Sequence, residues 1–110
     1  MTLADLRDAL LAATTKVYHF APPESVTGPY IVWAEDGQAN ASHGNNQMTV
    51  QVLTGTVDYF TKTEFDPNFD AIQAALNALK IAWRLNSIQY EEATKFLHYE
   101  WVWAFPQGVG

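Results

Sequence analysis

The most regular hydrophobic pattern in this chain is an alternation over residues 96–105. Successive side chains of a strand point to opposite faces, so this segment would have one wholly apolar or aromatic face and one mixed face. The apolar face would carry Leu97, Tyr99, Trp101, Trp103 and Phe105. The mixed face would carry Phe96, His98, Glu100, Val102 and Ala104. The pattern predicts a strand with one face in a core and the other partly in water.

Residues 83–90 predict a second strand, and the short polar link at 91–94 favours a hairpin between the two. An isolated hairpin is only marginally stable in water. We therefore expect the rest of the chain to supply further strands and a cover for this pair.

Apolar residues at spacings of three and four predict a first helix of about three turns near the N-terminus. Thr2 is placed to be its N-cap, and Asp5 would complete a capping box. The apolar stripe consists of Leu3, Leu6, Leu10 and Ala13. Residues 17–20 predict a short strand, and residues 21–29, rich in turn formers, predict a loop.

A second hairpin would begin with a strand at residues 30–35, which the turn dipeptide Asp36-Gly37 ends. Residues 38–47 are small, polar and without periodicity, which is typical of a mobile loop. We expect the loose segment to cover about 36–47.

Residues 48–62 predict a long strand in which Val50 and Val57 have opposite parity. We expect a β-bulge at Gly55 to bring both halves to one core. The alternative is a regular strand, in which Leu53 and Val57 share a face.

Asp66 and Pro67 are typical of the N-cap and first position of a second helix. Its apolar stripe consists of Phe69, Ile72, Leu76 and Leu79. The order of elements predicts two hairpins joined by this helix. The expectation is one α+β domain over residues 1–110, with an antiparallel or mixed sheet of about four strands and both helices on one face. The tail at 106–110 is expected to be loose.

The charge balance limits the classes of function. Twelve acidic and six scattered basic residues give a net charge of −6, so phosphate neutralisation, the main driving force for binding nucleic acid, is weak. The lack of cysteine excludes disulfides and thiolate metal sites. We expect no signal peptide, because acids lie in the first turns, and no membrane span, because no run of about 18 apolar residues occurs.

The histidines lie in separate segments without the local spacing of a metal site. His98 and Glu100 share a strand face and could begin one, but a partly exposed histidine in ordinary hydrogen bonds is far more common. The neighbouring acids Glu91 and Glu92 lie in a predicted turn, and acids at a helix start have structural roles. A carboxylate pair placed for acid–base work across a cleft is therefore not favoured.

No nucleophile elbow and no glycine-rich phosphate loop occurs. The aromatic residues of 97–105 could stack on bases or sugars, but on one face of a strand they are more typical of a core. We expect a protein that is not an enzyme, with no catalytic, cofactor-binding or metal-ligating residues.

Several segments resemble tail completion proteins of long-tailed phages, the family of tail terminator or head–tail joining proteins. The resemblance covers nearly the whole chain. It is carried by Pro29-Tyr30-Ile31-Val32-Trp33, Asp58-Tyr59-Phe60-Thr61-Lys62, Glu64-Phe65-Asp66-Pro67, Ile72-Gln73, Ser87-Ile88-Gln89-Tyr90-Glu91-Glu92 and His98-Tyr99-Glu100-Trp101. Gly55 and the glycine-rich tail depart from the family pattern.

The resemblance implies a structural protein of the virion tail, assembled in the cytoplasm of the bacterial host. Its α+β subunits would form a ring, usually hexameric, that caps the tail tube and joins it to the head. The implied partners are further copies of the chain, the major tail tube protein and a head-completion or connector protein, with no membrane. DNA would pass through the lumen without specific binding, and an acidic surface suits that passage.

Two sets of candidate residues follow. The candidate lumen or interface residues are Asp36, Asp58, Glu91 and Glu92. The candidate docking loop carries Asn40, His43, Asn45 and Asn46. The competing hypothesis is a small-molecule-binding α+β domain in which the aromatic strand at 97–105 lines a cavity.

Overall fold

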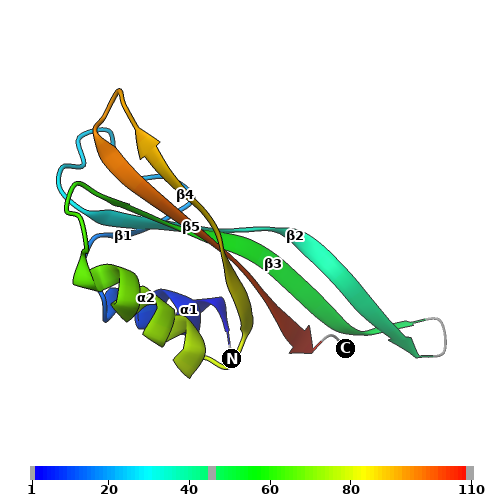
Figure 1. The fold of residues 1–110 in the computed structure, drawn as a ribbon. Coiled ribbons are helices and arrows are strands. Elements are labelled where there is room, and N and C mark those ends of the chain that lie inside the picture. Colours follow the sequence, from blue (N-terminus) through cyan, green and yellow to red (C-terminus); the bar gives the residue numbers. More distant parts are fainter. Residues whose placement is uncertain (1, 45–46, 109–110) are drawn as a thin grey trace.

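The computed structural model describes residues 2–44 and 47–108, with side chains except those of 40–50 and 107–108. Both helices lie on one face of a single sheet (Figure 1). The elements are α1 (Leu3–Leu11), β1 (Val17–His19), β2 (Tyr30–Gly44), β3 (Gln47–Thr61), α2 (Pro67–Ala78), β4 (Ala82–Glu91) and β5 (Phe96–Gly108). The sheet order is β1-β2-β3-β5-β4, with only the β1–β2 pair parallel. The α+β prediction is confirmed, with five strands instead of about four.

Local signals fix both helix starts. The Thr2 side chain accepts a hydrogen bond from the backbone N–H of Asp5, and the Asp5 carboxylate accepts one from the N–H of Thr2 at 2.8 Å. Asp66 caps α2 by accepting the N–H of Asn68 at 2.9 Å, and Pro67 is the first helical residue. Caps satisfy N–H groups that a helix leaves unpaired, so these residues set where each helix begins.

The core lies between the helices and the inner face of the sheet. The alternating face of β5 is on this side, as the sequence predicts, and the stripes of both helices pack against it. Phe69, expected in the core, is half-buried and packs against the core's edge. The buried hydrophobic residues are Leu6, Leu10, Ile31, Trp33, Val57, Tyr59, Ile72, Leu76, Trp101, Trp103 and Phe105.

The prediction of a β-bulge at Gly55 is wrong. β3 pairs with β5 without interruption from Val50 to Thr61, and the register shift next to Gly55 in the pairing with β2 places the extra residue, Asp36, on β2. A Cβ at Gly55 would lie 2.2 Å from the Trp103 ring and 2.2 Å from the Ala34 carbonyl oxygen. The glycine is there because an indole and a backbone carbonyl occupy the space of a side chain.

The prediction of a loop at about 36–47 is also wrong for most of these residues. β2 continues to Gly44 and pairs with β3 as far as Gln47, while residues 45–46 lie outside the described part. Small polar side chains do not prevent a backbone ladder, which needs only N–H and C=O groups. The tail expected to be loose from Pro106 likewise continues β5 to Gly108, paired with β3; residues 109–110 are not described.

The long hairpin gives the molecule an elongated shape. Residues 37–44 of β2 and 47–54 of β3, here called the arm, extend beyond the helices (Figure 1). The principal extents of the molecule are 52, 25 and 23 Å. In the described part of the chain, neither helix is long and apolar enough to cross a membrane.

Candidate functional site

The four candidate lumen acids do not form one surface. Asp58 on β3 and Glu91 at the end of β4 both contact the imidazole of His98. Glu92 is exposed in the following turn. Asp36 lies near the base of the arm, where its carboxylate accepts a hydrogen bond from the Thr54 hydroxyl at 2.7 Å. The structure therefore brings Asp58 and Glu91 together and leaves the other two apart.

His98 is held from both sides. Its Nε2 lies 2.7 Å from Asp58 Oδ1, and its Nδ1 lies 3.3 Å from Glu91 Oε2. The hydrogen bond with Asp58 is the largest cause that raises the pKa of His98; burial opposes it, and the charges of Asp58, Glu91 and Glu100 add to it. An imidazolium that donates Nε2–H to Asp58, with the Glu91 carboxylate close to Nδ1, suits this site.

This arrangement does not suit a metal ion. The two carboxylates lie at opposite nitrogens of the His98 ring, so they do not converge on one cation. Within the described residues, no group of three His, Asp or Glu side chains is placed to hold a metal.

Aromatic rings pack next to the His98–Asp58 ion pair, on the sheet face that the helices leave open. Phe60 stacks on His98 with ring centroids 4.2 Å apart, and Tyr30 stacks on Phe60 at 4.7 Å. The Phe96 ring packs edge-on against the rings of Tyr30 and Phe60. The Lys62 ammonium lies 5.1 Å from the centroid of the Phe96 ring. These rings restrict water around the ion pair, which strengthens it. The sequence shows the alternation of each strand but not the β3–β5 register that joins these residues.

The raised pKa of His98 makes part of the stability depend on pH. A raised folded-state pKa contributes stability that is complete below the unfolded pKa of about 6.5 and is lost as pH rises through the folded value. His98→Gln should therefore lower the melting temperature by a few degrees at pH 5.5 and by less at pH 9. Thermal unfolding of both proteins across this range measures the gap. An equal gap at every pH would contradict the charged pair.

A second cluster fixes the corner between β3 and α2. The buried Asp66 accepts hydrogen bonds from the hydroxyls of Tyr59 and Thr61, both at 2.7 Å, as well as the Asn68 N–H. Burial raises the pKa of Asp66, but these three donors outweigh burial and the net pKa is lowered. Burial and the bond to Asp66 raise the pKa of Tyr59 to about 12. Sequence reasoning predicts the cap and misses the network.

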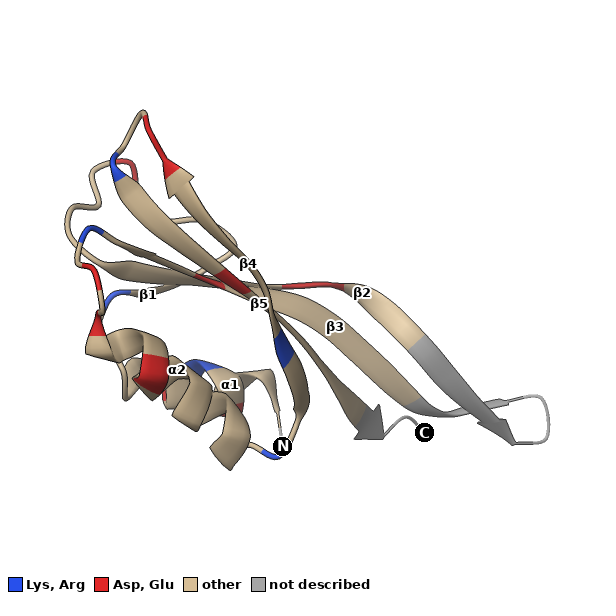
Figure 2. Ribbon diagram, in the orientation of Figure 1, with Lys and Arg blue, Asp and Glu red and all other residues tan. Residues whose placement is uncertain are grey.

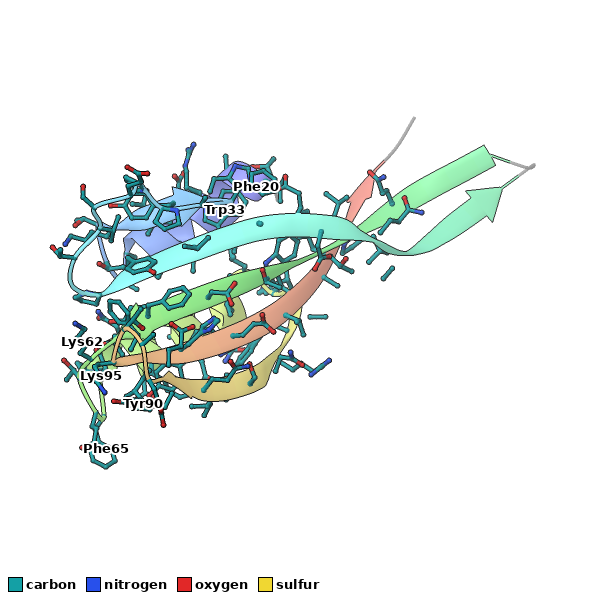
Figure 3. The ribbon with its side chains drawn as sticks, turned by 90° about the horizontal axis from the view of Figure 1, so that it is seen from above. Phe20, Trp33, Lys62, Phe65, Tyr90 and Lys95 are labelled. Carbon is teal, nitrogen blue, oxygen red and sulfur yellow. The ribbon has the colours of Figure 1, made fainter. Side chains whose placement is uncertain are left out.

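This corner presents an exposed aromatic side chain. Phe65 is 97% exposed and has a positive φ of 53°, which is unfavourable for a residue with a Cβ. The side chain points away from the body of the molecule (Figure 3). Beside it is a groove of about 480 Å³, whose lining includes Phe69, Ile88 and Leu97. Phe20, Lys80 and Lys95 also have a positive φ, so the backbone conformation alone does not distinguish Phe65.

A second concavity, of about 370 Å³, lies at the other end of α2, where β4 begins. It is lined by Asp36, Thr54, Gly55, Ala82, Trp83, Arg84, Val102, Trp103 and Ala104. Residues of both charges lie at the Phe65 end of α2 (Figure 2). Glu64, Asp66 and Asp70 line the groove there, with exposed Lys62 close by in the chain, whereas Asp36 and Arg84 line the concavity at β4.

The candidate docking residues fall on the arm or beyond the described part. Asn40 and His43 belong to β2, and nothing is described of their side chains. Asn45 and Asn46 lie outside the described residues.

Most of the buried part of the aromatic strand packs in the core. Trp101, Trp103 and Phe105 are at most 2% exposed, as the core interpretation predicts. Leu97 and Tyr99 border the groove beside Phe65, and Trp103 borders the concavity where β4 begins. The strand therefore borders a hollow at two places along its length.

A scan against protein-family models and a search of curated proteins give no match to this chain.

Proposed function

We propose that this chain is a structural subunit of a ring that caps the tail tube of a long-tailed phage and joins it to the head connector. The observation that carries the proposal is the shape of the subunit, an α+β body with a two-stranded arm beyond it. The sequence resemblance to tail completion proteins supports the same function. The protein would act by assembly and not by catalysis, in the virion tail.

The arm is suited to contact with a neighbouring protein. β1 covers only Ile31–Trp33 of β2, so among the described residues 35–44 pair on one side only, with β3. An unpaired strand edge offers a row of N–H and C=O groups to another chain. The arm contributes little to the core: among its residues whose side chains are described, none is fully buried, and only Leu53 packs against the core. Its length is therefore better explained by contact with the tube protein, the connector or the next copy than by folding.

The acidic balance supports passage of DNA through the ring. A net charge of −6 repels phosphates, so the DNA would move without forming ion pairs that hold it. Asp36 and Glu92 are exposed and are the first lumen residues to test. Asp58 and Glu91 are less suitable, because their carboxylates hold His98.

Electron microscopy of lysates tests the function. A phage that lacks this chain should produce tails that are unattached or over-long, and the wild-type chain supplied from a plasmid should restore virions. Normal tails firmly attached to heads in the absence of the chain would refute the proposal.

A shortened arm should separate folding from function. Residues 39–52 are replaced by Asn-Gly, which suits a two-residue turn between the paired Gln38 and Leu53. The variant should keep its helical circular dichroism and fail to restore joined virions. Glu24→Gln, an exposed change outside the arm, is the control and should restore them.

A further inference from the structure

The outer edge of β4 is unpaired in the described sheet. β4 is the last strand in the order β1-β2-β3-β5-β4, so β5 is its only neighbour there. From Ser87 to Glu91 its register with β5 is unbroken. This segment contains neither proline nor lysine, two residues that commonly block a strand edge. The edge is therefore ready to pair with another extended backbone.

The backbone direction shows which residues would form the new pairs. The Glu91 carbonyl accepts the N–H of Lys95 at 2.7 Å, in the turn that leads into β5, so the polar groups of Glu91 face β5. In an antiparallel ladder these groups point to alternate sides of the strand from one residue to the next. Those of Gln89 therefore also face β5, whereas those of Ile88 and Tyr90 face the free edge.

The same two residues expose apolar side chains. Ile88 and Tyr90 are each 56% exposed, and they lie opposite Tyr99 and Leu97, on the sheet face against which the helices pack. Ile88, Leu97 and Tyr99 also line the groove of about 480 Å³ at the start of α2. An added strand would place its alternate side chains beside Ile88 and Tyr90 and toward this groove, where they would lose contact with water.

The charges of the groove favour a basic side chain in the added strand. The charged residues of its lining are Glu64, Asp66 and Asp70, and its described lining contains no lysine or arginine. The net pKa of Asp66 is lowered, so this buried carboxylate is ionised at neutral pH, and its hydrogen-bond donors are neutral groups. The Lys62 ammonium lies over the Phe96 ring, on the open face of the sheet, and Lys95 lies in the turn after β4.

We propose that the β4 edge binds an extended segment of another protein as a sixth, antiparallel strand. The segment carries apolar side chains at alternate positions, followed on the same side by an arginine or a lysine. The free N–H and C=O groups of Ile88 and Tyr90 specify the extended backbone, and the groove specifies the side chains. A second copy of β4 fits less well, because it would bring the same acidic groove and a further net charge of −6 to the contact. The inference stands independently of the proposed ring.

Amide hydrogen exchange tests this contact with a defined probe. The probe is a peptide with blocked ends and the sequence Thr-Val-Thr-Ile-Thr-Arg, whose valine, isoleucine and arginine share one side. In the free protein the amides of Ile88 and Tyr90 should exchange fast, and that of Gln89 should exchange slowly. Peptide at about ten times its dissociation constant should slow exchange at Ile88 and Tyr90 about tenfold and change Gln89 little.

Modified peptides separate backbone pairing from side-chain attraction. N-methylation at the valine and isoleucine, which would lie opposite Ile88 and Tyr90, removes N–H groups that face β4 and should abolish the protection. The same modification at the threonines between them blocks groups that face water and should preserve it. Glutamate in place of the arginine should weaken binding about threefold or more at low salt.

A change in the protein tests the same edge. Tyr90→Pro removes one N–H from the free side of an edge strand, where proline is tolerated, and should abolish the protection of Ile88 by the peptide. Gln89→Thr is the matched control, because its backbone faces β5, and it should bind the peptide like wild type. Circular dichroism confirms that both variants are folded.

Each contrary result overturns the proposal at a different step. Unchanged exchange at Ile88 and Tyr90 with millimolar peptide would show that the edge accepts no such strand. Protection that survives N-methylation at the valine and isoleucine would exclude backbone pairing. Peptide-induced shifts at Phe69 and Leu97 without protection of Ile88 would show a ligand of the groove alone. Protection that appears without peptide and grows with protein concentration would show that a second copy occupies the edge.

Discussion

Ile72→Asp is expected to unfold the domain. Ile72 is fully buried on the face of α2 that packs against the sheet, in the same cluster as Leu76. Losing a buried isoleucine costs about 2–5 kcal/mol. Burying an unpaired carboxylate adds several kcal/mol more, unless it takes up a proton at a similar cost. The sum approaches the whole stability of a typical domain, roughly 5–15 kcal/mol.

Circular dichroism melts and proton NMR spectra measure this effect. The matched control is Ala74→Asp, which introduces the same charge on the exposed face of the same helix. It should remain folded with a melting temperature within a few degrees of wild type. A soluble Ile72→Asp protein with an unchanged melting temperature would show that α2 does not pack as described.

The elements that sequence reasoning predicts well are those with local causes. The caps at Thr2 and Asp66 act within three residues of the helix start, and the alternating face of β5 shows its buried side directly. The pairing of β4 with β5 as a hairpin could be predicted because the connection at 92–95 is short. The fold class follows from these pieces, since both apolar helix stripes and one strand face must share a core.

The failures have non-local causes. The continuation of β2 to Gly44 depends on its ladder with β3, and small polar residues carry no signal of that ladder. The His98 cluster depends on a register that places Phe60 opposite His98 and Asp58 opposite Glu100. The Asp66 network depends on a contact between β3 and the start of α2, where the Tyr59 hydroxyl donates a hydrogen bond to Asp66. Pattern and propensity do not specify these pairings.

Gly55 is the most instructive error, because glycine in a strand has two different explanations. One is a bulge, and the other is a close approach of another group. The opposite parity of Val50 and Val57 favours the bulge. Val50 is on the arm, however, and a residue on the arm need not face the core, so its parity does not indicate a bulge. The irregularity next to Gly55 is instead on β2, between Glu35 and Gly37, while β3 keeps an uninterrupted register with β5.

Gly55→Ala should therefore cost about 3 kcal/mol or more, at the upper end of overpacking penalties. The clash is at Cβ itself, with a backbone oxygen of Ala34 on one side and the Trp103 ring on the other, both at 2.2 Å. Neither neighbour has a flexible end that can move aside: the carbonyl belongs to the β2–β3 ladder, and the indole is 2% exposed in the core. The loss corresponds to a fall in melting temperature of about 10 °C or more.

Two variants separate this cause from an ordinary change in strand propensity. Thr56→Ala, at the next position of β3, removes a side chain from a half-buried site and should cost much less. Gly55→Val should be only moderately worse than Gly55→Ala, because the first carbon already produces the overlap. A bulge would tolerate alanine, so a Gly55→Ala protein as stable as wild type in chemical denaturation would restore the bulge and remove the contact between Trp103 and β3.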